Sequence, residues 1–197
     1  NPDGARGWDA PPPSRATFSP HPREALDALG LRITFFLVGI DPVQPANGAS
    51  LRAVTARGHE VGNHSFEHEP WLHRYDRSRL EAEIGRAEDS IAAATGERPI
   101  GFRGPGYSWS PALLEVLAAR GYLYDASTLP TYLGPLARTY YFWTAHLNAA
   151  QKPARDSLLG SFRDGLRPLT PSRWRPDRGH PLRAAPVPPV PGLTAPL

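Results

Sequence analysis

The chain has 197 residues, 40% of them hydrophobic and 21% charged, and its formal net charge is +3. This length and composition favour one ordinary domain. The most apolar run, residues 33–38, has the length of a buried strand and falls far short of the ~20 residues that cross a bilayer, so we expect no transmembrane segment. Cysteine is absent, which excludes disulfides, thiolate metal sites and cysteine nucleophiles. Any metal must therefore be held by His, Asp or Glu.

The C-terminal part of the chain is basic, and its basic residues are dispersed among prolines. Beyond Phe162 the sequence holds a single aromatic residue, Trp174, so the stacking platform that single-stranded nucleic acids need is missing. We therefore expect no nucleic-acid partner. The sequence leaves the oligomeric state and the cellular location open.

Strand and helix signals alternate along the chain. Runs rich in β-branched and aromatic residues predict strands over residues 31–39, 59–63, 99–102 and 122–126. Apolar periodicity and end signals predict helices over residues 23–29, 51–57, 79–94 and 111–120. The alternation predicts parallel strands with helical crossovers, closed as a barrel or left as an open α/β sheet. In such folds the loops at the carboxyl ends of the strands carry the chemistry.

Local signals mark the borders of these elements. Ser78 and Glu81 predict a capping box for the helix over residues 79–94, and Ser110 caps the helix that begins at Pro111. Proline and glycine dominate the ends of the chain. We expect an irregular N-terminal arm over 1–22, a folded domain over 23–175 and a proline-rich segment over 176–197, the last being a degraded strand or coil.

The strongest local feature is a pair of histidines, His64 and His68, that follows a predicted strand. At this spacing two imidazoles lie on the same side of one helical turn and can bind one divalent cation. A structural role is as frequent as a metal site for such a pair. A catalytic site also needs a third protein ligand, which the pair does not supply.

The same residues match a second pattern. Residues 64–68 read HSFEH, the H-x-x-E-H signature of one group of metallopeptidases, with Glu67 as general base. That signature requires a long continuous helix. Gly62 and Pro70 flank the motif closely, which disfavours the peptidase interpretation.

Two further polar clusters follow predicted strands. Residues 101–107 read GFRGPGY, where glycines allow close backbone approach to a ligand and Arg103 can hold a carboxylate. An ordinary turn between strand and helix is the competing interpretation. In the second cluster, Asp125 is either an acid, a base or an orienting residue, or the cap of the following turn.

Three segments together resemble a known family. Residues 34–39 read TFFLVG, residues 58–68 read GHEVGNHSFEH and residues 102–107 read FRGPGY; in order and spacing they resemble the polysaccharide deacetylases of the NodB-homology type, over residues 26–142. The resemblance implies a distorted (β/α) barrel. It also implies a metal-dependent hydrolase that removes acetyl groups from amino sugars or acetylated polysaccharides, breaking carbon–nitrogen bonds other than peptide bonds, with a carbohydrate as its partner.

The resemblance assigns roles to individual residues. His64 and His68 match the two metal-binding histidines, with zinc as the expected cation and cobalt or nickel also suited to such ligands. Arg103 matches the arginine that holds the catalytic aspartate. Pro105 and Tyr107 match the segment that walls the substrate groove and offers a main-chain donor to the oxyanion. Asp125 is also a candidate catalytic residue, on the basis of its position after a predicted strand and not of the resemblance.

The sequence departs from the family pattern at both ends, so we expect the barrel to be incomplete there. The family takes its third metal ligand and general base from an aspartate pair before the Thr-Phe-Phe strand. We expect this pair upstream of Asn1, with Asp3 as the weaker alternative. The C-terminal Leu-x-His block is also unmatched, and His180 is not expected to replace it. The chain as written should therefore bind divalent metal weakly and show little activity.

A second function stays open. A degenerate deacetylase domain can grip a glycan without catalysis, and four aromatic residues near the predicted loops could stack on sugar faces: Trp71, Tyr107, Trp109 and Tyr132. Core packing explains most of them equally well. The sequence does not distinguish among chitin, peptidoglycan, acetyl-xylan and smaller amides as substrates.

Overall fold

A computed structural model of the chain describes residues 26, 28–42, 47–69, 71–128, 170–175 and 180–186. Six strands form one sheet: β1 (Thr34–Leu37), β2 (Glu60–Asn63), β3 (Gly101–Phe102), β4 (Tyr124–Asp125), β5 (Ser172–Trp174) and β6 (Leu182–Ala184). Their order is β1-β2-β3-β4-β6-β5. Every adjacent pair is parallel except β5 and β6, which are antiparallel. The predicted arm, residues 1–22, lies outside the described residues.

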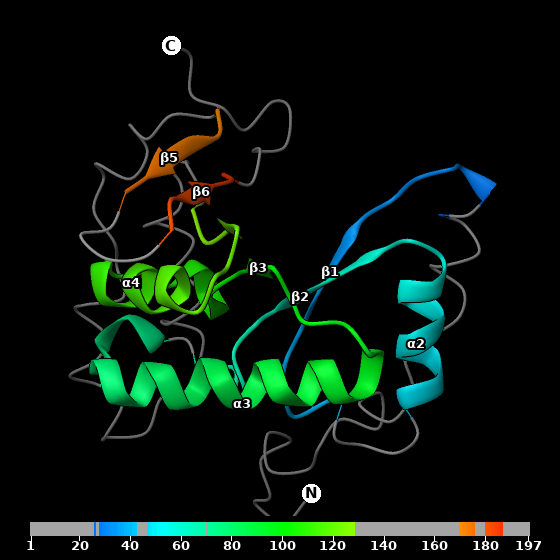
Figure 1. Ribbon diagram of the computed structural model, residues 1–197, viewed down its shortest axis with the longest axis horizontal. Coiled ribbons are helices and arrows are strands. Elements are labelled where there is room, and N and C mark those ends of the chain that lie inside the picture. The colour runs from blue at the N-terminus through cyan, green and yellow to red at the C-terminus, as the bar shows by residue number, and fades with distance from the viewer. Residues whose placement is uncertain are drawn as a thin grey trace, which may run out of the picture.

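In the described part of the chain, three helices lie along one side of this sheet (Figure 1). They are α2 (Gly48–Ala56), α3 (Arg77–Thr95) and α4 (Pro111–Ala119), each placed between two parallel strands as a crossover. The expected α/β fold with a parallel sheet is confirmed. Among the described residues the sheet is open from β1 to β5, so the closure expected of a barrel is not seen in this part of the chain.

The core lies between the sheet and its helices. One cluster joins α3 and α4 to β3 and β6, and includes the fully buried side chains Leu80, Ile84, Phe102, Leu117 and Leu182. A second cluster joins α2 and α3 to β1 and β2, and includes Leu37, Leu51, Val54, Val61 and Ile91. The apolar face predicted for the helix over residues 79–94 is therefore buried against the sheet, as amphipathic spacing requires.

The start of α3 differs from the prediction. The helix begins at Arg77, and Asp76, in extended conformation, caps it by accepting the N–H of Arg79 at 2.8 Å. The predicted capping box of Ser78 and Glu81 is wrong, because Ser78 already lies inside the first turn. The predicted cap of α4 is confirmed, since the Ser110 hydroxyl accepts the N–H of Leu113.

The proline-rich segment contributes to the sheet. Within residues 176–197, for which the sequence left strand or coil open, β6 pairs in parallel with β4. Its Leu182 is 1% exposed and packs into the first core cluster. In the part of the chain that the structure describes, no helix is long and apolar enough to cross a membrane.

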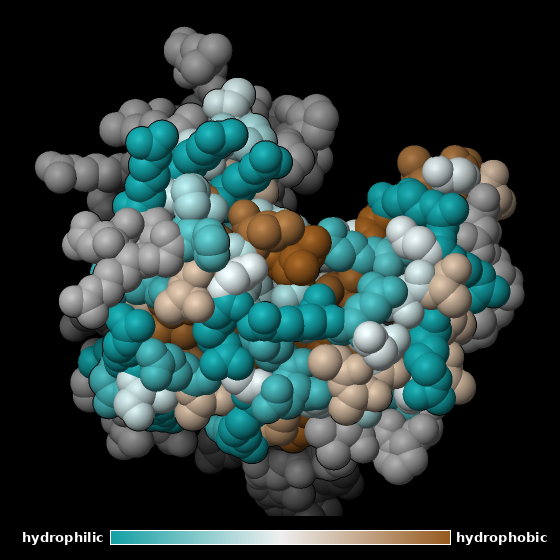
Figure 2. Space-filling model, in the orientation of Figure 1, coloured by the Kyte–Doolittle hydropathy of each residue, from teal (hydrophilic) through white to brown (hydrophobic). Residues whose placement is uncertain are grey.

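On the side of the sheet opposite these helices, the described residues line a cavity. This cavity of about 550 Å³ is lined by side chains from β1, β2, β4 and β6 and the loop after β3, among them Thr34, Phe36, Glu60, Arg103, Tyr124 and Arg183. In Figure 2 the surface is indented between the β5–β6 end of the sheet and the β1 end. Side chains alternate between the two faces of a sheet, so every second residue of these strands faces the cavity and the residues between them pack on the helices.

Candidate active site

The two candidate metal ligands lie in a tight loop directly after β2. The rings of His64 and His68 have centroids 4.9 Å apart at an interplanar angle of 63°. The loop is not helical, because Ser65 (φ 64°) and His68 (φ 60°) adopt the left-handed conformation. The predicted helical turn is wrong, although the predicted proximity of the two imidazoles is correct.

Tertiary hydrogen bonds explain why this loop is not a helix. The backbone oxygens of Ser65 and Phe66 accept the N–H groups of Gly39 and Ile40, at 2.8 and 3.2 Å. The groups that a helix would pair internally are therefore used to attach the loop to the segment after β1. The surrounding structure overrides the local spacing of the histidines.

The imidazole of His64 is held in one tautomer. Its Nδ1 lies 2.6 Å from the backbone oxygen of Arg103, the residue after β3. A carbonyl oxygen only accepts, so Nδ1 carries the proton and Nε2 keeps its lone pair. Burial lowers the pKa of His64 to about 4, with positive charge on His68 and Arg103 acting in the same direction and the hydrogen bond to the Arg103 carbonyl opposing it. At neutral pH this ring is an uncharged potential metal ligand.

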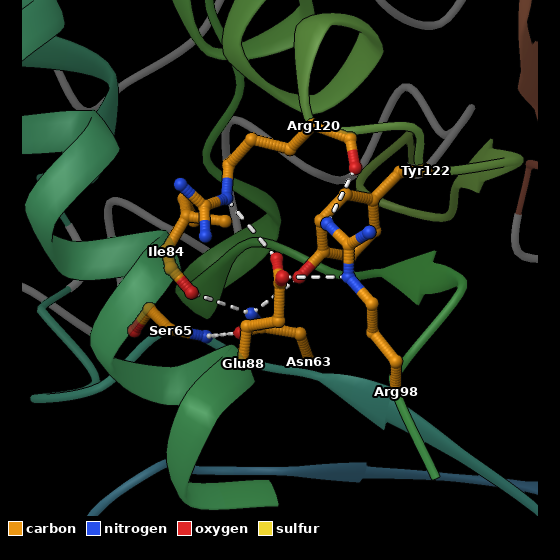
Figure 3. A network of polar contacts seen from close by, with 7 residues as sticks. All are labelled: Asn63, Ser65, Ile84, Glu88, Arg98, Arg120 and Tyr122. Atoms are coloured by element: carbon orange, nitrogen blue, oxygen red, sulfur yellow. Dashed lines mark hydrogen bonds and ion pairs between the residues drawn. The ribbon is translucent and has the colours of Figure 1, made fainter. Parts of the chain in front are cut away.

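Asn63, the last residue of β2, fixes the start of the loop from the helix side of the sheet. Its side-chain oxygen accepts the N–H of Ser65 at 2.8 Å. Its amide nitrogen donates to the backbone oxygen of Ile84 in α3 and to the Tyr122 hydroxyl, at 3.1 and 2.8 Å (Figure 3). Asn63 is fully buried, so all these bonds lie away from water.

An ion-pair cluster around the buried carboxylate of Glu88 supports the same region. The Glu88 carboxylate of α3 accepts from Arg98 at 2.6 Å and from Arg120 at 3.1 Å (Figure 3). Burial alone would raise the pKa of Glu88, but hydrogen bonds from both guanidinium groups outweigh burial and lower it. Arg98 also donates to the Arg120 backbone oxygen, which ties the segment before β3 to the end of α4.

The loop after β3 contains three of the other predicted site residues. Arg103 places its guanidinium carbon 4.4 Å from the centre of the Phe36 ring and lines the cavity. Within the described part of the chain, no carboxylate lies at ion-pair distance from Arg103. Pro105 and Tyr107 bound a short 3₁₀ turn in which the Tyr107 N–H donates to the Gly104 oxygen at 3.0 Å. A donor role of Tyr107 toward an oxyanion would require this bond to be shared or broken.

Asp125, at the end of β4, makes the contacts of a turn-capping residue. It is 2% exposed and accepts from the Ser127 hydroxyl and the Ser127 N–H. The Ser127 hydroxyl oxygen in turn accepts the N–H of Gly104 at 2.8 Å. Burial raises the pKa of Asp125 to about 6, with the two Ser127 hydrogen bonds and Arg103 acting in the opposite direction. Its catalytic role stays a prediction.

The donor chemistry of the histidine pair fits a divalent cation. A metal-bound imidazole normally donates its other ring N–H to a carbonyl or carboxylate, and His64 already does so. The two rings supply two ligands. Over the described ranges, no cluster of three or more His, Asp or Glu side chains could hold a metal. The described residues therefore supply two candidate ligands, fewer than the three protein ligands that a catalytic metal site normally has.

The sequence interpretation missed one buried group at this site. Glu83 of α3 accepts two backbone N–H groups of the histidine loop, from Phe66 and Glu67. A signal was present, because Glu83 falls on the same helical face as Leu80 and Ala87, where an apolar residue is expected. A charged residue on a buried helical face indicates a polar partner on the element that covers it.

Comparison with known proteins supports the fold and the family. The sequence profile of the polysaccharide deacetylase family matches residues 7–124, more than half of the chain. A parallel α/β sheet with a histidine pair after its second strand is thus combined with the sequence pattern of that family. The chain belongs to the polysaccharide deacetylase family.

Solved structures show the same fold at low sequence identity. A protein from Mycobacterium smegmatis assigned as a polysaccharide deacetylase matches with a TM-score of 0.59 and 20% identity, over 83% of this chain and 43% of that one. A family 4 carbohydrate esterase from Streptomyces lividans, in complex with acetate, matches at 0.50 and 24%, over 73% and 81%. A family 4 pseudoenzyme from Bacillus anthracis matches at 0.51 and 18%, over 71% and 53%. The chain thus spans less than half of the Mycobacterium smegmatis protein.

Proposed function

We propose that this chain carries out metal-dependent removal of acetyl groups from amino sugars or acetylated polysaccharide. Its membership of the polysaccharide deacetylase family supplies the reaction class. The observation that carries the proposal is the state of His64, whose Nδ1–H is committed to the Arg103 carbonyl while the ring stays uncharged, 4.9 Å from the ring of His68. An uncharged imidazole with its proton on Nδ1 keeps the Nε2 lone pair with which it can bind a cation.

His64 and His68 would hold the cation, zinc by preference and cobalt or nickel as alternatives, together with a ligand from outside the described residues. A bound divalent cation lowers the pKa of water toward about 7 and polarises an acetyl carbonyl. The hydrogen bond from His64 to Arg103 fixes the ring and keeps its proton on the nitrogen that faces away from the cation. Arg103, stacked on Phe36, presents a positive charge to the cavity, where it can hold a carboxylate.

The metal part of the proposal is tested by Co²⁺ titration of the 197-residue chain, followed by calorimetry and visible absorption. We expect weak binding that His64→Ala and His68→Ala each abolish. His180→Ala is the control, because His180 is exposed and does not belong to the loop. Binding that survives both loop substitutions would overturn the assignment of these residues as ligands.

The reaction is tested by acetate release from acetylated chito-oligosaccharides at saturating metal. We expect little release from the 197-residue chain, and release sensitive to His64→Ala from a longer chain that extends upstream of Asn1. The reason is that a missing general base typically costs about 10²–10⁴-fold in rate. Normal turnover by the 197-residue chain would show that its own residues supply the aspartates, and no release from either chain would refute the activity.

A second candidate is a non-catalytic glycan-binding domain. Two observations favour it: no third ligand joins the histidine pair within the described residues, and one similar structure is that of a pseudoenzyme. Trp71 and Trp109 are partly buried and pack on the core cluster, which limits their use as sugar platforms. Glycan binding that is independent of metal and without turnover in a longer chain would favour this candidate.

The H-x-x-E-H peptidase hypothesis receives no support from the geometry. Residues 64–68 form a loop, whereas the peptidase signature needs its histidines on a continuous helix. The Glu67 carboxylate pairs with Arg86 at 3.2 Å on the surface, where both side chains are about half exposed. Glu67→Gln should therefore have little effect on acetate release.

A further inference from the structure

The histidine loop is held from the side of α3 by a single buried carboxylate. Oε1 of Glu83 accepts the backbone N–H of Phe66 at 2.9 Å and that of Glu67 at 2.7 Å. Glu83 is only 6% exposed. The two N–H groups belong to residues that lie between His64 and His68 in the sequence, so the carboxylate acts on the segment that connects the two imidazoles.

The conformation of the loop creates this carboxylate site. The left-handed φ of Ser65 brings the next two N–H groups together toward α3, and paired backbone N–H groups of this kind form a concave anion site. A carboxylate oxygen that accepts backbone N–H groups makes hydrogen bonds stronger than neutral ones. In a helical loop these N–H groups would point along the helix axis instead. Glu83 therefore stabilises the non-helical form specifically.

The loop is consequently clamped from two sides. On one side, Gly39 and Ile40 donate to the Ser65 and Phe66 oxygens. On the other side, the Glu83 carboxylate accepts the N–H groups of Phe66 and Glu67. Between these attachments the Ser65 hydroxyl oxygen accepts the N–H of His68 at 3.1 Å. This bond holds the backbone of His68 close to Ser65, the residue that follows His64. Release of the Glu83 side would free the part of the loop that leads to His68.

We propose that Glu83 is a positioning residue for the histidine pair: by binding the two intervening N–H groups it sets the separation of His64 and His68. This proposal rests on the proposed function, because it takes the histidine pair to bind a metal. It adds to that function the residue that holds the two ligands in place. Removal of a group that orients metal ligands typically lowers metal affinity about 10–100-fold.

The same helix offers a matched control. Arg86, one turn further along α3, contacts the same two loop residues through their side chains, with its guanidinium carbon 3.9 Å from the centre of the Phe66 ring and an ion pair to Glu67. These contacts lie on the surface and contribute little. Arg86→Ala thus removes contacts to the same residues without touching their backbone.

The experiment compares four forms of the 197-residue chain: wild type, Glu83→Ala, Glu83→Gln and Arg86→Ala. Co²⁺ affinity is the first measurement. We expect Glu83→Ala to lower affinity about tenfold or more, and Glu83→Gln, whose amide oxygen can still accept both N–H groups, to recover most of it. Arg86→Ala should stay within about threefold of wild type. Equal affinities of Glu83→Ala and wild type would overturn the proposal.

The second measurement uses no metal. Amide exchange and ¹H–¹⁵N NMR of the metal-free chain report whether the Phe66 and Glu67 N–H groups are hydrogen-bonded, and nuclear Overhauser effects report the contact between the two imidazoles. We expect slow exchange and the contact in wild type and Glu83→Gln, and loss of both in Glu83→Ala. Fast exchange of these two amides in wild type would refute the proposal even if Glu83→Ala does not fold.

The two measurements separate the hypotheses. If wild type binds no Co²⁺ but Glu83→Ala alone loses the imidazole contact, the positioning role stands and the metal-dependent function falls. If wild type binds Co²⁺ through His64 and His68 and Glu83→Ala binds equally well, the function stands and the positioning role falls.

Discussion

The imidazole Nδ1 of His64 lies 2.6 Å from the backbone oxygen of Arg103. This contact joins the loops that follow β2 and β3, two neighbouring parallel strands, at the carboxyl edge of the sheet. The first candidate metal ligand and the backbone of the arginine loop are therefore one structural unit. A displacement of either loop changes the orientation of the ring.

The side chain of Asn63 should be a major source of stability. Asn63→Ala removes the partner of the Ser65 N–H and one of the partners of the Tyr122 hydroxyl in a buried region. We expect the free energy of unfolding to fall by about 2–4 kcal/mol, since each buried group left unpaired costs about 1–3 kcal/mol. Urea unfolding followed by circular dichroism measures it. Tyr122→Phe, which removes one hydroxyl, should cost about 1 kcal/mol, and an Asn63→Ala loss no larger than that would contradict the expectation.

The ion pairs of Glu88 should be worth more than a surface pair. Its side chain is 9% exposed and accepts from two arginines, so Glu88→Gln, which turns one oxygen into a donor, should destabilise the fold by about 1–3 kcal/mol. Glu115→Gln is the control, because Glu115 is 43% exposed and pairs with Arg77 at 3.4 Å; about 0.5 kcal/mol or less is expected. Urea unfolding at pH 7 compares the two.

The contribution of Glu88 to the free energy of unfolding should depend on pH. The pKa of Glu88 is lowered in the folded chain from its ordinary 4.5. A depressed folded pKa gives stability that is present above the unfolded pKa and lost as pH falls through the folded one. The difference in the free energy of unfolding between wild type and Glu88→Gln should therefore become smaller below pH 4.5. A difference that stays constant down to pH 3 would show that Gln disrupts packing rather than charge.

Asp125 should show the opposite pH dependence. Its folded pKa is raised from 3.8 to about 6, so between these values the folded chain binds more protons than the unfolded chain. Stability from this group therefore falls as pH rises through that window and is constant above it. Between pH 4 and pH 7 the free energy of unfolding of wild type should fall by on the order of 2 kcal/mol more than that of Asp125→Asn. Parallel pH profiles of the two proteins would show that Asp125 is ionised throughout.

The backbone at Gly104 has no room for a side chain. A Cβ added there would collide with the backbone oxygen of Ser108, although the φ of Gly104 is an ordinary −73°. Gly104→Ala should cost about 1–3 kcal/mol and shift the loop that carries Pro105 and Tyr107. Gly48→Ala, at the start of α2 with its nearest neighbour 3.6 Å away, should be neutral or stabilising. Thermal unfolding of both variants checks this; equal melting temperatures would contradict it.

Element types were predictable because they depend on local patterns. The buried strands and the apolar face of α3 follow from periodicity, and the Ser110 cap of α4 follows from a local hydrogen bond. Boundaries were less accurate: α2 begins at Gly48 rather than at residue 51, and α3 begins at Arg77 under an Asp76 cap. Helix ends are set by which of several adjacent polar side chains becomes free to cap, which depends on the incoming chain direction.

The contacts of the site were less predictable than its residues. His64, His68 and Arg103 could be singled out by type and spacing, and the structure joins the loops that carry them. That Asp125 contacts Ser127, and that a glutamate in the middle of a helix binds the histidine loop, depends on residues far apart in the sequence. Spacing alone cannot show such partners, because each lies on a different element.

The sequence by itself determined the alternation of strands and helices, the two candidate metal ligands and the family. The tertiary structure decided that the histidine loop is non-helical, that His64 is uncharged with its proton on Nδ1, and that Asn63 and Glu83 hold the loop from the helix side. The physical reason is that periodicity and spacing act over a few residues. Burial and the pairing of backbone groups are settled only when distant segments pack together and exclude water.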